Sequence, residues 1–108
     1  MLKLKTVKRF EKNYERVLKS SKPATATRIK RRMGEVIDCL IKGHPIPPSF
    51  CDHDLKDNRK FKNCRDCHIL GDLVLVYKVE DGTCTLLLLD LDTHSNLFED
   101  YTYTGAYI

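Results

Sequence analysis

The sequence predicts an α+β fold, in which an antiparallel sheet of about four strands carries two N-terminal helices packed on it. The first half of the chain contains two apolar stripes at helical spacing, and the second half contains apolar runs separated by turn residues. Helices that precede most of the strands favour a sheet with its helices gathered on one face. At 108 residues, the chain is expected to form a single domain over residues 1–108.

The first predicted elements are a short strand and a helix. Residues 2–5 alternate apolar and basic side chains, as in a strand with one covered face. Thr6 is expected to cap the helix that follows over residues 7–20. The apolar stripe of this helix consists of Phe10, Tyr14, Val17 and Leu18.

A second helix should begin near Thr25 or Thr27 and end before Gly43, because glycine is favoured just past a helix. Its apolar stripe consists of Ile29, Met33, Val36, Ile37, Leu40 and Ile41. Residues 44–48 include three prolines, which remove backbone donors and keep this segment extended. A polar loop is predicted to follow over residues 51–60.

Three further strands are predicted over residues 61–69, 73–79 and 84–91. The middle one opens with an unbroken apolar run, which is typical of a central strand covered on both faces. Asp81 and Gly82 separate it from the last strand, and this pair should supply the positive φ of a hairpin turn.

Positive charge is concentrated in the first half of the chain. Residues 1–50 contain 13 Lys and Arg against 4 Asp and Glu, whereas residues 51–108 contain 6 against 11. This asymmetry predicts a basic face for an anionic partner, nucleic acid, although a solvated pair of surface helices would give the same pattern. The candidate RNA-binding residues are Lys8, Lys12, Arg16, Arg28, Arg31, Arg32, Lys56, Arg59, Lys60 and Lys62.

The cysteines and the N-terminus predict a cytoplasmic protein. Five cysteines are an odd number, and the first residues are too charged to resemble a signal peptide. We therefore expect a reducing compartment with mostly free thiols. No run approaches the roughly 18 apolar residues of a membrane span, so a membrane is not an expected partner.

Residues 64–68 match the Cys-x-x-Cys-His pattern of covalent haem attachment. A zinc site is the other metal alternative, with ligands drawn from Cys51, His53, Cys64, Cys67 and His68. A strand would point Cys64 and Cys67 to opposite faces, and the chain has no second Cys-x-x-Cys pair. We therefore predict no metal and no cofactor.

Three histidines have neighbours suited to proton transfer. His53 stands between two aspartates, His68 precedes Asp72 by four residues, and His94 would share a helical face with Phe98 if residues 95–98 form one helical turn. Metal-free RNA cleavage needs a base for the 2′-hydroxyl, an acid for the leaving oxygen and a cation for the phosphoryl group. Histidine suits both proton transfers, and an aromatic ring can hold a base.

The candidate catalytic residues are therefore His53, Arg65, His68, Asp72, His94 and Phe98. By residue type alone, three ordinary surface histidines are the more common explanation of this pattern.

Four blocks resemble the YafQ-type toxins of the RelE superfamily, the toxin halves of bacterial toxin–antitoxin pairs. Their order matches the family, and together they cover about half of the chain. The first half of the chain agrees only in its layout of one strand and two helices. The blocks are Pro47-Pro48 leading into residues 52–55, residues 65–68 with Asp72, residues 73–78, and residues 93–98.

The resemblance implies a small RelE-like domain and a ribosome-dependent endonuclease of messenger RNA. Cleavage would proceed without a metal, by attack of the 2′-hydroxyl on the adjacent phosphate. His94 would be the general acid, the base would come from His53, His68 or Asp72, and Phe98 would stack on or position a base. The implied partners are a cognate antitoxin, the ribosome and messenger RNA, with DNA bound only through the antitoxin complex.

The chain departs from the family pattern at several points. Asp90 and Asp92 stand where the family commonly has arginine and glycine, and two carboxylates near a scissile phosphate would repel it. Phosphate stabilisation would then fall to Arg65, Lys62 or the cations of the preceding loop. Residues 99–108 extend beyond the usual family end. A non-catalytic RNA- or protein-binding relative of the same scaffold is the alternative.

Overall fold

The computed structural model describes residues 1–55 and 61–98. The elements are β1 (Lys3–Thr6), α1 (Lys8–Ser20), α2 (Pro23–Lys42), the 3₁₀ turn η1 (Pro48–Phe50), β2 (His53–Asp54), β3 (Arg65–Leu70), β4 (Leu73–Glu80), the 3₁₀ turn η2 (Asp81–Thr83) and β5 (Thr85–Thr93). Residues 94–98 are helical. The predicted tail over residues 99–108 lies outside the described residues.

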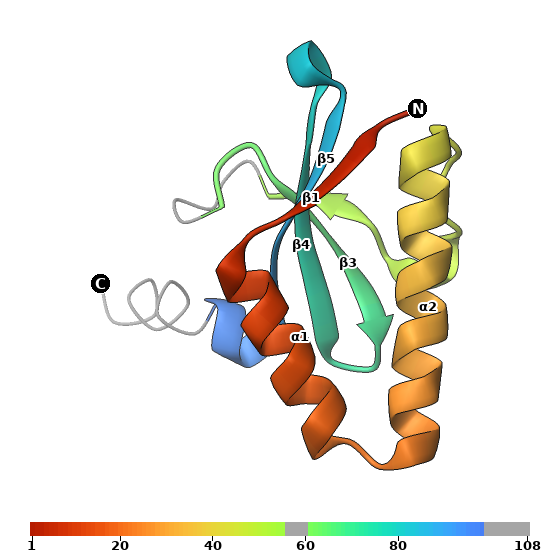
Figure 1. Cartoon of the computed structure of the whole chain (residues 1–108), viewed down its shortest axis with the longest axis vertical. Coiled ribbons are helices and arrows are strands. Elements are labelled where there is room, and N and C mark those ends of the chain that lie inside the picture. The colour runs from red at the N-terminus through yellow and green to blue at the C-terminus, as the bar shows by residue number, and fades with distance from the viewer. Residues whose placement is uncertain (56–60, 99–108) are drawn as a thin grey trace.

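One five-stranded sheet runs through the molecule in the order β1-β5-β4-β3-β2 (Figure 1). β1 pairs with β5 in parallel, and the other pairs are antiparallel. The predicted α+β class is confirmed. The fifth strand is β2, which forms inside the predicted polar loop because two residues are enough to pair with the edge of β3.

The two helices cover one face of the sheet (Figure 1), and a second, smaller cluster covers the other. The buried residues of this second cluster are Leu55, Phe61, Cys64, Val74, Val76, Leu97 and Phe98. On β4, Leu73, Leu75 and Tyr77 face the helices, while Val74 and Val76 face away. All five side chains are buried. The prediction of a central strand covered on both faces is therefore confirmed.

The helix starts differ from the expected positions. α2 begins at Pro23, earlier than predicted, because proline fits the first turn of a helix, where its missing N–H costs nothing. α1 follows an uncapped Val7, so the predicted cap by Thr6 is wrong; the Thr6 hydroxyl instead donates to Glu11. No helix in the described ranges is long and apolar enough to span a membrane.

Two strand boundaries also differ. β3 begins at Arg65, because the chain turns before it at Asn63, which has a φ of 64°. Between β4 and β5, the positive φ falls on Cys84, at 50°, and not on Gly82. The loop closes as the 3₁₀ turn η2, which moves the left-handed residue to the position after it.

Two glycines of α2 should respond oppositely to the same substitution. Gly43 ends the helix at a φ of 73°, whereas a Cβ added at Gly34 within the helix meets nothing within 4 Å. We expect Gly43→Ala to lower the free energy of unfolding by about 1 kcal/mol. Gly34→Ala should raise it by roughly 0.5–1 kcal/mol. Urea denaturation measures both, and shifts of equal sign would contradict this account of the helix end.

Candidate active site

Three of the four histidines gather on the sheet face opposite the helices. His53 lies on β2, His68 near the end of β3, and His94 in the helical segment after β5. The rings of His68 and His94 stack with centroids 6.4 Å apart. The structure thus brings together three of the predicted site residues, from segments far apart in the sequence.

Strand register explains this convergence. Asp66 and His68 pair with Val76 and Val74, which face away from the helices. His53 pairs with Asp66 across β2 and β3, and so shares that face. The Nδ1 atom of His53 lies 2.7 Å from Oδ1 of Asp66.

The turn between β3 and β4 contacts the ring of His68 and the backbone of His94. Nδ1 of His68 lies 3.3 Å from the carbonyl oxygen of Gly71, and the backbone N–H of His94 donates to the carbonyl oxygen of Asp72 over 3.0 Å. A carbonyl oxygen only accepts, so this contact favours the tautomer of a neutral His68 ring that has its proton on Nδ1 and its lone pair on Nε2. Asp72 itself is exposed and contributes to the site through its backbone.

Asp66 is the functional candidate that sequence reasoning missed. Its side chain is 0% exposed, and neither carboxylate oxygen receives an aligned hydrogen bond from the described residues. Burial raises the pKa of the Asp66 carboxyl, which the charges of His53, His68 and His94 partly oppose and that of Asp52 reinforces. The available signal was its i, i+2 spacing to His68 within a predicted strand, which places both on one face.

Phe98 packs beneath the histidines and is not open to solvent. Its ring centroid lies 4.7 Å from that of His94 and 5.9 Å from that of Phe61, in an edge-on contact. The residue is 6% exposed. In this position Phe98 supports His94 directly, and stacking on an RNA base would require the ring to become accessible.

Arg65 does not join the cluster. It pairs with Tyr77 across the sheet, and Tyr77 faces the helices. Its guanidinium donates two hydrogen bonds to Oδ2 of Asp52, at 2.7 and 3.2 Å, and the Tyr77 hydroxyl donates to the same carboxylate. The structure therefore places Arg65 outside the histidine cluster to which it was assigned, because strand alternation turns its side chain to the other face of the sheet.

The predicted RNA-binding cations divide into three groups. Those exposed among the described residues are Lys8, Lys12, Arg16, Arg28, Arg31 and Lys62. Lys56, Arg59 and Lys60 lie outside the described residues. Arg32 is partly buried, with its guanidinium 4.1 Å from the Phe50 ring and a hydrogen bond to the Ile69 carbonyl, so its expected RNA-facing role gives way to a structural one.

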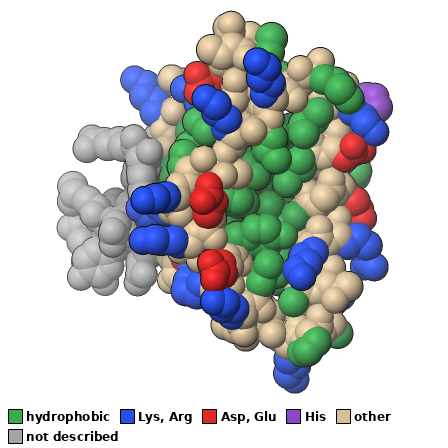
Figure 2. Space-filling view, viewed as in Figure 1, with side chains coloured by type: hydrophobic (Ala, Val, Ile, Leu, Met, Phe, Trp, Pro, Cys, Tyr) green, Lys and Arg blue, Asp and Glu red, His purple; other side chains and the backbone are tan. Residues whose placement is uncertain are grey.

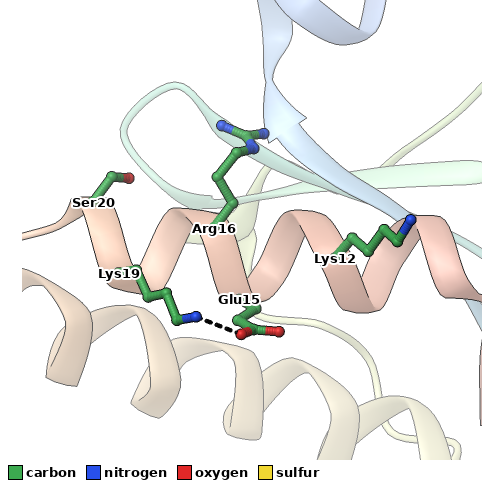
Figure 3. A pocket seen from close by; sticks show the side chains of 5 residues that line it. All are labelled: Lys12, Glu15, Arg16, Lys19 and Ser20. Atoms are coloured by element: carbon green, nitrogen blue, oxygen red, sulfur yellow. Dashed lines mark ion pairs between the residues drawn. The ribbon is translucent and has the colours of Figure 1, made fainter.

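On the helix side, Lys and Arg side chains surround a central apolar area (Figure 2). One basic groove of about 540 Å³ lies along α1. Within it, Lys19 pairs with Glu15 over 2.6 Å, and Arg16 points away from that pair (Figure 3). The groove is lined by Lys12, Glu15, Arg16, Lys19 and Ser20.

The unusual carboxylates Asp90 and Asp92 are bound by α1. Arg9 Nε lies 2.7 Å from Asp90 Oδ2, and Arg16 Nη2 lies 3.0 Å from Asp92 Oδ2. Asn13 donates to Asp90 over 2.6 Å. Cations of the same chain therefore oppose both negative charges, which changes the expectation that they would simply repel a phosphate.

Cys64 and Cys67 belong to different clusters, on opposite faces of the sheet. This is the arrangement expected of a strand, and it keeps the Cys-x-x-Cys pair from converging on one ion. All five cysteines are free, and among the described residues no group of three or more potential ligands is placed to hold a metal.

Solved structures share this fold. A metal-bound toxin from Helicobacter pylori superimposes with a TM-score of 0.76 at 33% identity, over 91% of this chain and 100% of that one. The toxin in the DinJ–YafQ complex of Escherichia coli gives a TM-score of 0.72 at 25% identity, over 91% and 99%. The shared fold therefore defines the class of this protein, a small RelE-like α+β toxin domain.

Sequence comparison narrows the class. A putative toxin YafQ of Haemophilus influenzae is 41% identical over 61 residues, or 55% of this chain and 58% of that protein. Residues 2–99 match the sequence model of a family described as "Bacterial toxin of type II toxin-antitoxin system, YafQ". The chain belongs to this YafQ toxin family.

The buried carboxylate leads to a stability prediction. Because its folded pKa is raised, the contribution of Asp66 to stability is present below the unfolded pKa and is lost as pH rises through the folded pKa. At pH 7, Asp66→Asn should therefore stabilise the fold by about 1 kcal/mol, or roughly 4–8 °C in Tm. The gain should vanish below about pH 4.

Thermal unfolding across this pH range measures the effect, with Asp54→Asn as the matched control. Asp54 neighbours His53 but is exposed, so its substitution should change the free energy of unfolding by less than about 0.5 kcal/mol. If Asp66→Asn lowers Tm at pH 7, attraction to the imidazoles outweighs the burial of the charge.

Proposed function

We propose that this chain is a ribosome-dependent endonuclease that cuts messenger RNA without a metal. The observation that carries the proposal is the convergence of three imidazoles around one buried carboxylate, on the sheet face left free by the helices. In the reaction, a base takes the 2′-hydroxyl proton, the 2′-oxygen bonds to phosphorus, and the bond to the 5′-oxygen breaks. An acid donates the proton that the leaving oxygen needs.

His94 is proposed as the acid and His53 as the base. Nδ1 of His53 faces two acceptors, Asp66 and the carbonyl oxygen of Cys51 at 3.2 Å, which leaves Nε2 with its lone pair. The Asp66 carboxylate would also stabilise the imidazolium that forms when His53 takes a proton. His68 is close enough to His94 to share the phosphate, and Asp72 acts through its backbone.

Positive charge for the phosphoryl oxygens would come from Lys62, which is exposed beside the second cluster, and from the imidazolium of His94. The exposed cations of α1 and α2 lie on the opposite face and are better suited to a larger anionic surface, such as ribosomal RNA. Arg65 is already committed to Asp52.

A cognate antitoxin is the proposed protein partner. The solved Escherichia coli relative is described as a DinJ–YafQ complex, and family membership supports an equivalent pair here. DNA would be contacted only through that complex. We place the protein in the cytoplasm, where its five free thiols would stay reduced.

Cleavage of messages on programmed ribosomes tests the proposal. His94→Gln should lower the single-turnover rate by about 10²–10⁴-fold, because the leaving oxygen loses its acid. His44→Gln is the matched control, since His44 is exposed in the proline segment, and it should leave the rate unchanged. Treatment of the protein with EDTA, removed before the ribosomes are added, should also have no effect.

Three results would count against this function. Unchanged cutting by His94→Gln would remove the acid from His94. Loss of cutting after the protein alone has been treated with EDTA would indicate a metal enzyme, which the metal-bound state of the Helicobacter pylori relative makes worth testing. Salt-dependent binding without cut products would favour the non-catalytic alternative.

Phe98 should affect both folding and cleavage, contrary to the expectation that it acts mainly on RNA. Phe98→Ala removes a ring that is 6% exposed, and should cost about 3 kcal/mol of stability. Phe98→Leu keeps most of the packing, so we expect a folded protein that cuts more slowly because His94 loses its ring contact. Tm and single-turnover rate measured together separate the effects; a fully active Phe98→Leu would limit Phe98 to packing.

A further inference from the structure

Polar side chains of α1 bind two carboxylates near the end of β5. Arg9, Asn13 and Arg16 recur at i, i+4 and i+7, so they lie on one side of the helix. Arg9 and Asn13 bind Asp90, whereas Arg16 binds Asp92, two residues before His94. The two carboxylates thus have the same helix as partner but different neighbours beyond it.

Asp92 continues the contact into the segment that carries His94. Its Oδ1 accepts the backbone N–H of Thr93 at 2.8 Å and the side-chain amide of Asn96 at 3.0 Å. The backbone N–H of Asn96 also donates to the Thr93 hydroxyl at 3.2 Å, in the manner of a helix cap. A continuous link therefore runs from Arg16 through Asp92 to Asn96.

The Asp92 carboxylate in this link is ionised. Burial raises the pKa of Asp92, but the hydrogen bonds from Asn96 and Thr93 and the charge of Arg16 outweigh it, so the net pKa is lowered. Arg16 keeps about half of its side chain exposed (53%) while it makes the contact. The carboxylate is thus charged at neutral pH and can accept all of these donors together.

We propose that Asp92, held by Arg16, is a positioning residue of the active site that fixes the helical turn carrying His94. The proposal rests on the nuclease function above. Within residues 1–55 and 61–98, the other contacts that hold His94 are its backbone bond to Asp72, the rings of His68 and Phe98, and the charge of Asp66. A shift of about 1 Å in a reacting group can cost 10²-fold in rate, so the orientation of this turn matters.

Asp90 provides the matched comparison. It lies on the same strand, is bound by the same helix and has a side chain only 1% exposed, yet among the described residues its carboxylate contacts α1 and the neighbouring Leu91 backbone, not the segment of His94. Asp90 should therefore matter for stability and Asp92 for the geometry of His94. Replacing each in turn separates a structural contact from a positioning contact.

The experiment measures single-turnover cleavage, KM for programmed ribosomes and Tm for Asp92→Ala, Asp92→Asn and Asp90→Asn. Asp92→Ala should lower the rate by about 10–100-fold with KM changed less than about twofold. Asp92→Asn keeps an oxygen acceptor for Thr93 and Asn96, and should recover part of the rate. Asp90→Asn should lower Tm more than Asp92→Asn does, with a wild-type rate for the folded fraction.

Two results would overturn the proposal: a wild-type rate in Asp92→Ala, or an equal loss of rate in Asp90→Asn. Ring contacts measured by NMR provide a readout that is independent of cleavage. In Asp92→Ala, the nuclear Overhauser contact between His94 and Phe98 should weaken, while the signals of His53 stay in place. If wild-type protein does not cut at all, the nuclease function fails, and this ring contact still decides whether Asp92 positions His94.

Discussion

Strand β4 is buried on both of its faces, and this double coverage determines where the chemistry can be placed. Its odd-numbered side chains pack in the core beneath α1 and α2, and its even-numbered valines belong to the second cluster on the other face. Because β3 pairs with β4, the same alternation places Asp66 and His68 on the face of the second cluster and Arg65 on the helix face. A shift of one residue would exchange the two sets. The register of a single strand pair thus selects the catalytic candidates.

This placement buries the Asp66 carboxylate in apolar surroundings, which disfavour its charged form. Asp66 is surrounded by Val76, by the partner strands and by imidazoles, and it has no aligned donor among the described residues. A carboxylate in such a place persists only when opposite charge is close by. His53 at 2.7 Å supplies that charge when protonated. Stability and function therefore oppose each other at this position, as is common where groups are arranged to move protons.

Much of the fold followed from local patterns, because helix periodicity and apolar runs are carried by residues close together in sequence. Gly43 ended its helix as predicted, and His53, His68 and His94 met as the family blocks implied. The pairing of β2 and the partners of Asp66 depend on strand register, which no local pattern encodes. Arg65 was misplaced for the same reason, since its residue type suited the chemistry but its side of the strand did not.

The charge asymmetry illustrates a further limit of sequence reasoning. The positive charge of residues 1–50 suggested an anionic partner, yet several of these cations bind groups within the protein. Arg9 and Arg16 bind carboxylates of β5, and Arg32 lies over the Phe50 ring. The acidic and basic halves are thus partly each other's counterions. What remains for an external anion is the smaller set of exposed cations on α1 and α2. Because Arg16 belongs to both groups, being paired with Asp92 and half exposed at the basic groove, it connects the basic surface of α1 with the turn that carries His94.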